Sequence, residues 1–295
     1  MKVHKWQALG NDYLVVDEGE LPWDISPKRI RLLCDRHFGV GSDGLLLLGP
    51  PLSEAAVASL RIFNPDGTEA ELSGNGARQA ALFLVDLGRT ESETFVIDTK
   101  GGPVEPTVLS EHEVRMSMGT ASTSSPDLFP GGPADGVGEL EAAGRAWNYQ
   151  FHTVGNPQCA IRVDVGLEEL DLSELGPAIE RHEMFPQRTN VSFWALEEGP
   201  DGRTRVRARI FERGVGETLA SGTGACGAAL AAWRTGAGSP LAVRLDGGEL
   251  TVAIDDGVEL TLTGEAEKVF TADLSAELAE ALESERVPPS LSPPA

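Results

Sequence analysis

The sequence predicts an α+β protein of two similar halves, each a curved, mostly antiparallel sheet or barrel around one apolar helix. The first observation is a duplication. Residues 61–82, RIFNPDGTEAELSGNGARQAAL, recur without a gap as residues 209–230, RIFERGVGETLASGTGACGAAL, with 11 of 22 positions identical. The second observation is that short β-prone runs bounded by turn residues surround both copies, as is typical of strands. The length of 295 residues also suits two domains better than a single core.

The duplicated pattern extends beyond these two segments. A Gly-Asn pair precedes each copy, at residues 10–11 and 155–156, and a Gly-Gly pair follows each, at residues 101–102 and 247–248. Each half therefore carries the same series of landmarks in the same order.

A stretch rich in Ser, Pro and Gly separates the two halves. It covers residues 120–136, TASTSSPDLFPGGPADG, and has the composition of a linker. We therefore expect an N-terminal half over residues 1–120 and a C-terminal half over residues 121–272. Residues 273–295 are expected to form a C-terminal helix and a disordered, Pro-rich tail.

Strands and helices are expected from local patterns. Helix signals are a Ser-Pro start, Ala/Leu-rich stretches and terminal glycines, which predict helices over residues 26–39, 76–88, 224–236 and 274–285. The second and third of these are apolar nearly all round, so they must be buried at the centre of the two halves. Apolar and β-branched runs predict strands over residues 45–49, 58–63, 94–99, 113–118, 160–165, 190–196, 205–211, 241–245, 250–254 and 258–262.

The composition excludes several classes of function. A net charge of −22 argues against nucleic acid and against an anionic membrane surface as partners. There is no apolar run of membrane-spanning length and no signal peptide at the N-terminus, which predicts a cytoplasmic protein. The three cysteines, Cys34, Cys159 and Cys226, are widely spaced, so we expect neither a metal site nor a disulfide framework.

The two Ser-Gly-x-Gly-Ala motifs are the strongest candidates for a site. Ser73 and Ser221 each precede a predicted buried helix, whose first-turn N–H groups and dipole would bind an anion such as a carboxylate. One such motif alone is better explained by an N-cap serine and a packing glycine. A duplicated pair favours a small anionic ligand in a cleft between the halves, with one serine from each side.

Polar residues near the motifs could complete such a pocket. Each asparagine alone is better explained as a turn former. Together they would offer neutral donors and acceptors to an amino acid, with Glu212 accepting the ammonium and Arg213 pairing with a carboxylate. Glu212 aligns with Asn64 in the duplication, so the halves differ where a substrate would be asymmetric. The asparagines are Asn11, Asn64, Asn75, Asn156 and Asn190.

These motifs resemble those of the diaminopimelate epimerase family, in the cofactor-independent amino-acid racemase superfamily. The similar stretches are LGNDYLVVD (9–17), LCDRHFGVGSDGLLLL (33–48), RIFNPDGTEAELSGNGAR (61–78), VGNPQCA (154–160), RTNVSF (188–193) and FERGVGETLASGTGAC (211–226).

The resemblance implies an isomerase in lysine and peptidoglycan-precursor synthesis that converts LL-diaminopimelate into meso-diaminopimelate. It implies two similar domains closing on the substrate, a homodimer, and no metal or pyridoxal phosphate. One side chain removes the α-proton and another returns a proton on the opposite face, at positions 73 and 221. By the same resemblance, the substrate is bound by Asn11, Asn64, Gly74, Asn75, Asn156, Asn190, Glu212, Arg213, Gly222 and Thr223.

The sequence departs from the family pattern at four positions. The pattern has cysteine where this chain has Ser73 and Ser221, histidine where it has Gln158, and often glutamine where it has Gly44. A thiol has an unperturbed pKa of about 8.5, whereas a serine hydroxyl lies near water's value of about 15.7. Forming the serine base therefore costs on the order of 10 kcal/mol more, which predicts weak catalysis.

Three hypotheses stay open for the serines. In the first, the serines were engineered to inactivate the protein, which leaves Gln158 unexplained. In the second, the chain is a natural divergent member with weak or different activity, such as a dehydratase or another isomerase. In the third, it is a non-catalytic amino-acid-binding protein. Cys226 and Cys159 do not replace the missing thiols, because they lie five residues and one residue beyond Ser221 and Gln158.

Overall fold

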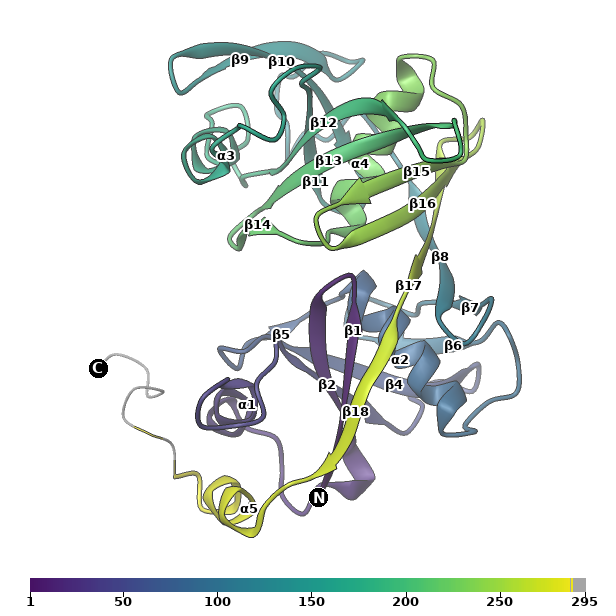
Figure 1. The fold of residues 1–295 in the computed structure, drawn as a ribbon, viewed down its shortest axis with the longest axis vertical. Coiled ribbons are helices and arrows are strands. Elements are labelled where there is room, and N and C mark those ends of the chain that lie inside the picture. Colours follow the sequence, from purple (N-terminus) through teal and green to yellow (C-terminus); the bar gives the residue numbers. More distant parts are fainter. Residues whose placement is uncertain (287, 289–295) are drawn as a thin grey trace. The chain divides into compact units, whose positions relative to one another are not determined.

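The computed structural model describes residues 1–286 and residue 288, and it divides into two compact units. Unit 2 is the continuous segment Ser117–Gly264, whereas unit 1 combines Met1–Met116 with the chain from Glu265 onward. The C-terminal boundary differs from the predicted one because strand β18 (Glu267–Asp273) pairs with β1 (Lys2–Ala8), as Figure 1 shows. The predicted disordered tail lies outside the described residues, apart from residue 288.

Unit 1 is a mixed, mostly antiparallel sheet with a long helix against it. Its strand order is β18-β1-β2-β3-β4-β5, with β6 beside β4, and its parallel pairs are β2–β3 and β4–β6. Its elements after β1 are β2 (Asn11–Asp17), η1 (Glu18–Glu20), α1 (Pro27–Cys34), β3 (Leu45–Gly49), β4 (Ala56–Phe63), β5 (Glu69–Ala70), α2 (Gly74–Asp86), β6 (Val96–Thr99), β7 (Thr107–Val108), β8 (Glu113–Thr120, which leads into unit 2), β18 and α5 (Ala276–Glu283).

Unit 2 repeats this plan. Its strand order is β17-β16-β15-β13-β12-β11-β10-β9, with β14 beside β13, and its parallel pairs are β11–β12 and β13–β15. Its elements are β9 (Val137–Ala142), β10 (Arg145–Thr153), β11 (Pro157–Arg162), α3 (Leu172–Glu180), β12 (Asn190–Glu198), β13 (Thr204–Glu212), β14 (Gly216–Thr218), α4 (Gly222–Arg234), β15 (Leu241–Leu245), β16 (Gly248–Ile254) and β17 (Glu259–Glu265, which leads back to unit 1).

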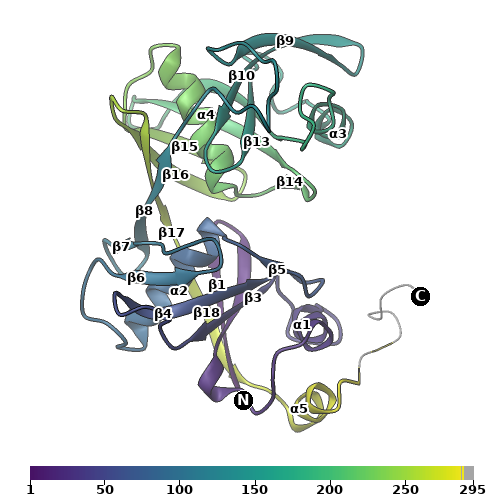
Figure 2. The same ribbon diagram turned by 180° about the vertical axis from the view of Figure 1, so that it is seen from behind.

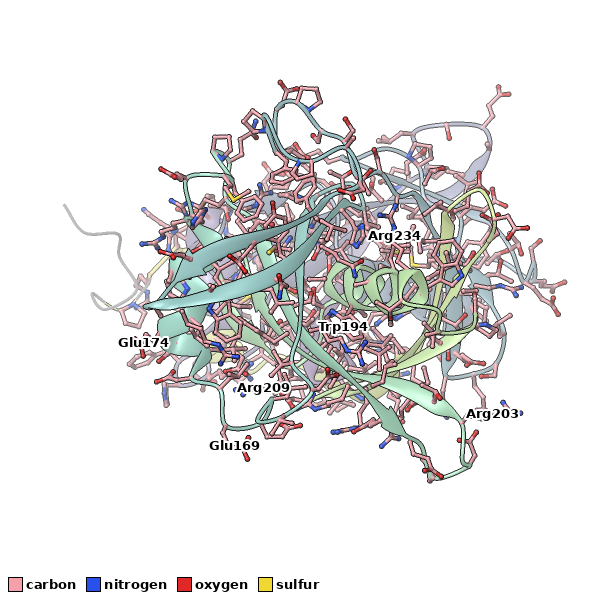
Figure 3. All side chains as sticks on the ribbon, turned by 90° about the horizontal axis from the view of Figure 1, so that it is seen from above. Glu169, Glu174, Trp194, Arg203, Arg209 and Arg234 are labelled. Atoms are coloured by element: carbon pink, nitrogen blue, oxygen red, sulfur yellow. The ribbon has the colours of Figure 1, made fainter. Side chains whose placement is uncertain are left out.

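The duplication seen in the sequence is a duplication of structure. Strand β4, strand β5 and helix α2 recur 148 residues later as β13, β14 and α4. Even a surface ion pair recurs, because Arg61 Nε donates to Glu69 Oε1 at 2.9 Å and Arg209 Nε donates to Glu217 Oε1 at 3.0 Å. Figure 3 labels this second arginine on its strand. The α+β class and the two similar halves are therefore confirmed.

Each long helix is buried against its own sheet, as its composition requires. Ala77, Ala80 and Ala81 of α2 are fully buried, and α2 packs on β1, β2, β3 and β4. Helix α4 likewise packs on strands from β10 to β16, and Figure 2 shows it on one face of β13 and β15. A helix that touches so many strands of one sheet requires that sheet to curve around it. Of the described helices, none combines the length and apolar character needed to cross a membrane.

Local signals explain where the helix predictions were accurate and where they were wrong. Helices α2 and α4 start two residues before the predicted starts, because Ser73 and Ser221 cap them. Helix α1 ends at Cys34 rather than near residue 39, because the Asp35 carboxylate accepts the N–H groups of His37 and Phe38 and closes a turn. Helix α3 was not predicted, since Gly176 and Pro177 interrupt its pattern.

The two glycines of each Ser-Gly-x-Gly motif have different roles. A Cβ placed on Gly76 would lie 2.9 Å from Leu46 Cδ2, and one on Gly224 would lie 2.7 Å from Ile210 Cγ2. By contrast, a Cβ on Gly74 would meet no atom of the described residues within 4 Å, and one on Gly222 would meet Leu262 Cδ1 only at 3.6 Å. The second glycine therefore lets the helix approach the sheet, whereas the first faces open space.

We expect Gly224→Ala to lower the free energy of unfolding by about 1–3 kcal/mol, because the added methyl group forces Ile210 and the helix apart. Gly222→Ala, two residues earlier, is the matched control and should change it by less than about 0.5 kcal/mol. Urea denaturation of both variants checks this. Equal losses of stability in the two variants would contradict the distinction between the glycines.

A buried histidine lies under helix α4. His152 of β10 is fully buried, pairs across the sheet with Gln158 of β11, and neither ring nitrogen has a hydrogen-bond partner among the described residues. Burial, assisted by the positive charge of Arg234 at the end of α4 (Figure 3), lowers the pKa of His152 to about 3. The ring is therefore neutral in the folded chain at neutral pH.

This burial should make unit 2 sensitive to acid. The unfolded chain protonates His152 below its ordinary pKa of about 6.5 while the folded chain does not, so stability falls as the pH drops from about 6.5 toward 3. Between pH 7 and pH 5 the loss should be about 2 kcal/mol. His152→Phe should remove that part of the pH dependence in denaturation experiments, whereas the exposed control His112→Phe should not. An unchanged slope in His152→Phe would contradict this account.

Candidate active site

Ser73 caps helix α2 and lies at the centre of a polar cluster in unit 1. Its Oγ accepts the N–H of Gly76 at 3.1 Å and the hydroxyl of Tyr13 at 3.4 Å. The serine is half-buried, and Gly74 beside it is open. A small anionic group at this end of α2 would therefore meet a hydroxyl and the N–H groups of a first helical turn.

Two asparagines are held beside this serine. Asn75 Nδ2 donates to Asn11 Oδ1 at 3.2 Å, and Asn11 Nδ2 donates to Asp43 Oδ2 at 3.1 Å. On its other side, Asn75 Oδ1 accepts from Arg78 Nη2 at 2.7 Å, and Gln79 Nε2 donates to the backbone oxygen of Asn11 at 3.0 Å. Helix α2 and strand β2 thus fix the orientation of both amides together.

An ion-pair network supports the strand that carries Asn11. Asp12 contacts Lys5 at 2.6 Å and Arg36 at 2.8 Å, and the same arginine contacts Asp43 at 2.8 Å. Burial alone would raise the pKa of Asp12, but the hydrogen bonds from Arg36 and Lys5 outweigh it and hold the pKa below its usual value. Asp12 is therefore an anion, and Arg36 links it to Asp43, whose side chain accepts from the amide of Asn11.

Asn64 stands apart from this cluster in its contacts. It is exposed in the turn after β4, where its Nδ2 donates to Thr68 Oγ1 at 2.9 Å and its backbone N–H to the oxygen of Thr68 at 2.8 Å. These contacts are those of a turn-forming asparagine. The binding role assigned to Asn64 by resemblance stays a prediction.

Ser221 occupies the corresponding place in unit 2. It caps α4, is nearly fully buried, and its Oγ accepts the N–H of Gly224 at 3.2 Å. The carboxyl of Glu212 lies alongside. Burial raises the pKa of Glu212, and the nearby hydroxyls of Ser221 and Thr218 oppose that rise. The serine of unit 2 therefore has a carboxyl beside it, whereas the serine of unit 1 has a phenol.

Asn156 is fixed beside Ser221 from two sides. Its Nδ2 donates to Thr223 Oγ1 at 3.2 Å, in the first turn of α4, and its Oδ1 accepts from Gln158 Nε2 at 2.6 Å. Gln158 has room under the helix because residue 227 is a glycine, whose Cβ would lie 3.0 Å from that of Gln158. At the position where the resemblance expects histidine, the chain thus carries an amide that orients Asn156.

Asn190 anchors the loop that carries Glu212 and Arg213. Its Oδ1 accepts the backbone N–H of Arg213 at 2.8 Å, and its Nδ2 donates to the oxygen of Pro157 at 3.0 Å. The nearly buried carboxylate of Glu180 accepts the next N–H of the loop, that of Gly214, at 2.8 Å. Two buried polar groups therefore hold the backbone of this loop, while the guanidinium of Arg213 is exposed.

The structure thus gathers the sequence-predicted residues into one cluster in each unit. Asn11, Ser73, Gly74 and Asn75 meet in unit 1. In unit 2, the group comprises Asn156, Asn190, Glu212, Arg213, Ser221, Gly222 and Thr223. Within the described part of the chain, no three His, Cys, Asp or Glu side chains come together as ligands of one metal ion would.

Sequence reasoning missed the residues that orient these groups. They include Tyr13, two residues after Asn11 on β2, and Asp43. Glu180 and Gln79 were also missed, because Glu180 lies in a helix that was not predicted and Gln79 lies two residues beyond the motif at the start of α2. The period of alternation along β2 was the one available signal, since it places Tyr13 on the same face as Asn11.

Comparison with known proteins agrees with this arrangement. The sequence profile of the family described as diaminopimelate epimerase matches residues 3–124 and 151–269. The chain is 38% identical over 282 residues to diaminopimelate epimerase 2 of Nostoc sp. (strain PCC 7120), covering 94% of this chain and 97% of the relative. It is 40% identical over 286 residues to the diaminopimelate epimerase of Synechococcus sp. (strain JA-3-3Ab), covering 92% and 97%.

Solved structures of more distant proteins have the same fold. A probable proline racemase from Agrobacterium radiobacter K84 superposes with a TM-score of 0.64 at 17% identity, covering 93% of both chains. A hydroxyproline epimerase from Agrobacterium vitis gives a TM-score of 0.62 at 18% identity, covering 92% of this chain and 91% of the other. The match of the family profile over most of the chain and the identity to these relatives show that this chain belongs to the diaminopimelate epimerase family, whose members are cofactor-independent isomerases.

Proposed function

We propose that this protein epimerises diaminopimelate between its LL and meso forms, with Ser73 and Ser221 at the two proton-transfer positions. The observation that carries the proposal is the repeated helix start. In each unit a serine hydroxyl caps a buried helix and lies beside a glycine that faces open space. Membership of the family supports diaminopimelate as the substrate. The reaction would serve lysine and peptidoglycan-precursor synthesis.

The residues beside the serines suit recognition of an amino acid. We assign substrate carboxylate binding to the helix starts at Gly74 and Gly222, whose N–H groups lie at the positive ends of the helix dipoles. Arg213 is exposed and offers a guanidinium for a second carboxylate. Glu212 is assigned to an ammonium group. The oriented amides and hydroxyl of Asn11, Asn75, Asn156, Asn190 and Thr223 complete the proposed binding set, together with Asn64.

Catalysis by the serines should be slow. A serine hydroxyl near the pKa of water, about 15.7, is a far weaker acid than a thiol near 8.5. Each serine oxygen accepts a helix N–H, which stabilises an alkoxide only in part. Serine in place of cysteine at both positions favours two alternative functions. One is an amino-acid-binding protein that kept the pocket without the chemistry, and the other is a dehydratase or isomerase of another substrate.

We further propose a cytoplasmic homodimer. Sedimentation analysis of the purified chain would test the dimer.

Deuterium uptake tests the proposed reaction. Incubated with LL-diaminopimelate in D₂O, the unmodified chain should incorporate deuterium at the α-carbon slowly but above the protein-free rate. Ser73→Cys/Ser221→Cys should raise that rate at least about 100-fold, because a thiol is the better acid and base. Mass spectrometry and proton NMR measure both rates.

Calorimetry and mass spectrometry, carried out alongside deuterium uptake, separate the alternative functions. Saturable binding by calorimetry without uptake in either protein would favour a binding protein, and a new product mass would favour a dehydratase or another isomerase. Rapid exchange by the unmodified chain, equal to that of the cysteine variant, would contradict the chemical argument about serine.

The open glycines provide a test of binding. Gly222→Ala should weaken diaminopimelate binding by about tenfold, because its methyl group occupies the space where a carboxylate would meet the start of α4. Its stability should stay near that of the unmodified chain. Isothermal calorimetry measures the binding, and urea denaturation of Gly222→Ala checks that the helix itself is undisturbed. Unchanged affinity in Gly222→Ala would contradict the proposed carboxylate position.

A further inference from the structure

The hydroxyl of Tyr13 is directed at the oxygen of Ser73. Tyr13 lies on β2 with its side chain largely buried, and its hydroxyl donates to Ser73 Oγ at 3.4 Å. The same oxygen accepts the N–H of Gly76 at 3.1 Å. Catalytic hydrogen bonds are often this long before substrate binds and shorten in the complex.

These two bonds determine where the proton of Ser73 points. A serine hydroxyl has one O–H donor and two acceptor lone pairs. With Tyr13 and Gly76 both donating to the oxygen, its lone pairs are occupied and its own hydrogen must point away from both donors. Ser73 can therefore give its proton to a third atom, and the hydroxyl of Tyr13, already hydrogen-bonded to Ser73 Oγ, can replace that proton.

The chain makes room for this tyrosine at Gly44. A Cβ placed on Gly44 would lie 2.6 Å from Tyr13 Cε1, and it would also collide with the backbone oxygen of Phe63. The ring thus occupies the space that any side chain at residue 44 would need. Both the backbone oxygen of Phe63, 2.4 Å from such a Cβ, and the ring of Tyr13 therefore exclude a glutamine at residue 44.

The other half of the duplication has no such phenol. Asn11 corresponds to Asn156, so the counterpart of Tyr13 two residues later is Gln158. The amide of Gln158 donates to Asn156 Oδ1 at 2.6 Å and has no accessible proton equilibrium. The phenol is therefore particular to Ser73, and the internal repeat does not require it.

We propose that Tyr13 and Ser73 act as a two-residue proton relay, in which the serine transfers the proton and the tyrosine is the group that titrates. This inference rests on the proposed epimerisation. When Ser73 gives its proton to the α-carbanion, a C–H bond forms, the serine O–H bond breaks, and the Tyr13 proton moves to Ser73 Oγ. The resulting phenolate takes a proton from solvent water. In the opposite direction, Ser73 Oγ takes the α-proton as the C–H bond breaks, and the serine's own proton moves to the Tyr13 phenolate.

The relay resolves the main chemical difficulty of the serine. The unperturbed pKa of a tyrosine phenol is about 10, compared with about 8.5 for a thiol. A phenol is therefore, by several pKa units, the stronger acid of the two hydroxyls in the relay. A serine with a tyrosine behind it can thus exchange protons at a rate that a serine alone could not reach.

A double-mutant comparison tests the relay. In the unmodified chain, Tyr13→Phe should lower deuterium uptake by at least about 100-fold. In the Ser73→Cys/Ser221→Cys protein the same Tyr13→Phe change should lower uptake by less than about threefold, because a thiol titrates without help. The chain has only two tyrosines, so Tyr149→Phe is the matched control and should leave uptake unchanged in both proteins.

Each outcome has a distinct meaning. Unchanged uptake in Tyr13→Phe, or an equal loss in the serine and cysteine proteins, would overturn the relay and leave the epimerase function standing. Thermal unfolding of Tyr13→Phe identifies a loss that is due to unfolding, and the cysteine protein with Tyr13→Phe then decides whether the phenol matters beyond the fold. No uptake by the unmodified chain above the protein-free rate would overturn the proposed function, and the relay with it.

Discussion

Burial of one apolar helix against a curved sheet is the constraint on which each unit depends. Because α2 and α4 are apolar nearly all round, their sheets must curve around them, and Gly76 and Gly224 allow the close approach. The same packing fixes where each helix begins. That position determines the serine caps, the exposed N–H groups and the open glycines. The chemistry of the site and the stability of the core therefore share one cause.

The two halves keep this plan and differ in the polar residues around it. In unit 1 a glutamine on the helix, Gln79, reaches the strand asparagine; in unit 2 the helix has Gly227 at that place, and the glutamine comes from the strand as Gln158. In both units a glutamine amide therefore contacts the asparagine, Asn11 or Asn156, although it comes from the helix in unit 1 and from a strand in unit 2. The duplicated halves therefore share the backbone plan, while the groups that hold each asparagine and those beside each serine diverged.

The sequence alone predicted the parts of the fold that rest on local patterns. The duplication located both central helices, and apolar runs between turns predicted many of the strands around them, but not β1, β2, β9 or β10. It could not predict β18 as a partner of β1, because that pairing joins residues far apart in the chain. At the site, motifs identified Ser73 and Asn11. Alternation along β2 places Tyr13 on the same face as Asn11, but its contact with Ser73 joins two separate elements and could not be predicted from the sequence.

The pairing of β18 with β1 also sets an order in which the units can be completed. Unit 2 is continuous in the chain, so all of its strands exist once residue 265 has been synthesised. Unit 1 lacks its edge strand until residue 273, and Leu282 of α5, which is fully buried in the same core as α1, comes later still. During synthesis the half that begins second can therefore finish folding first, and the N-terminal half waits with β1 as an open sheet edge.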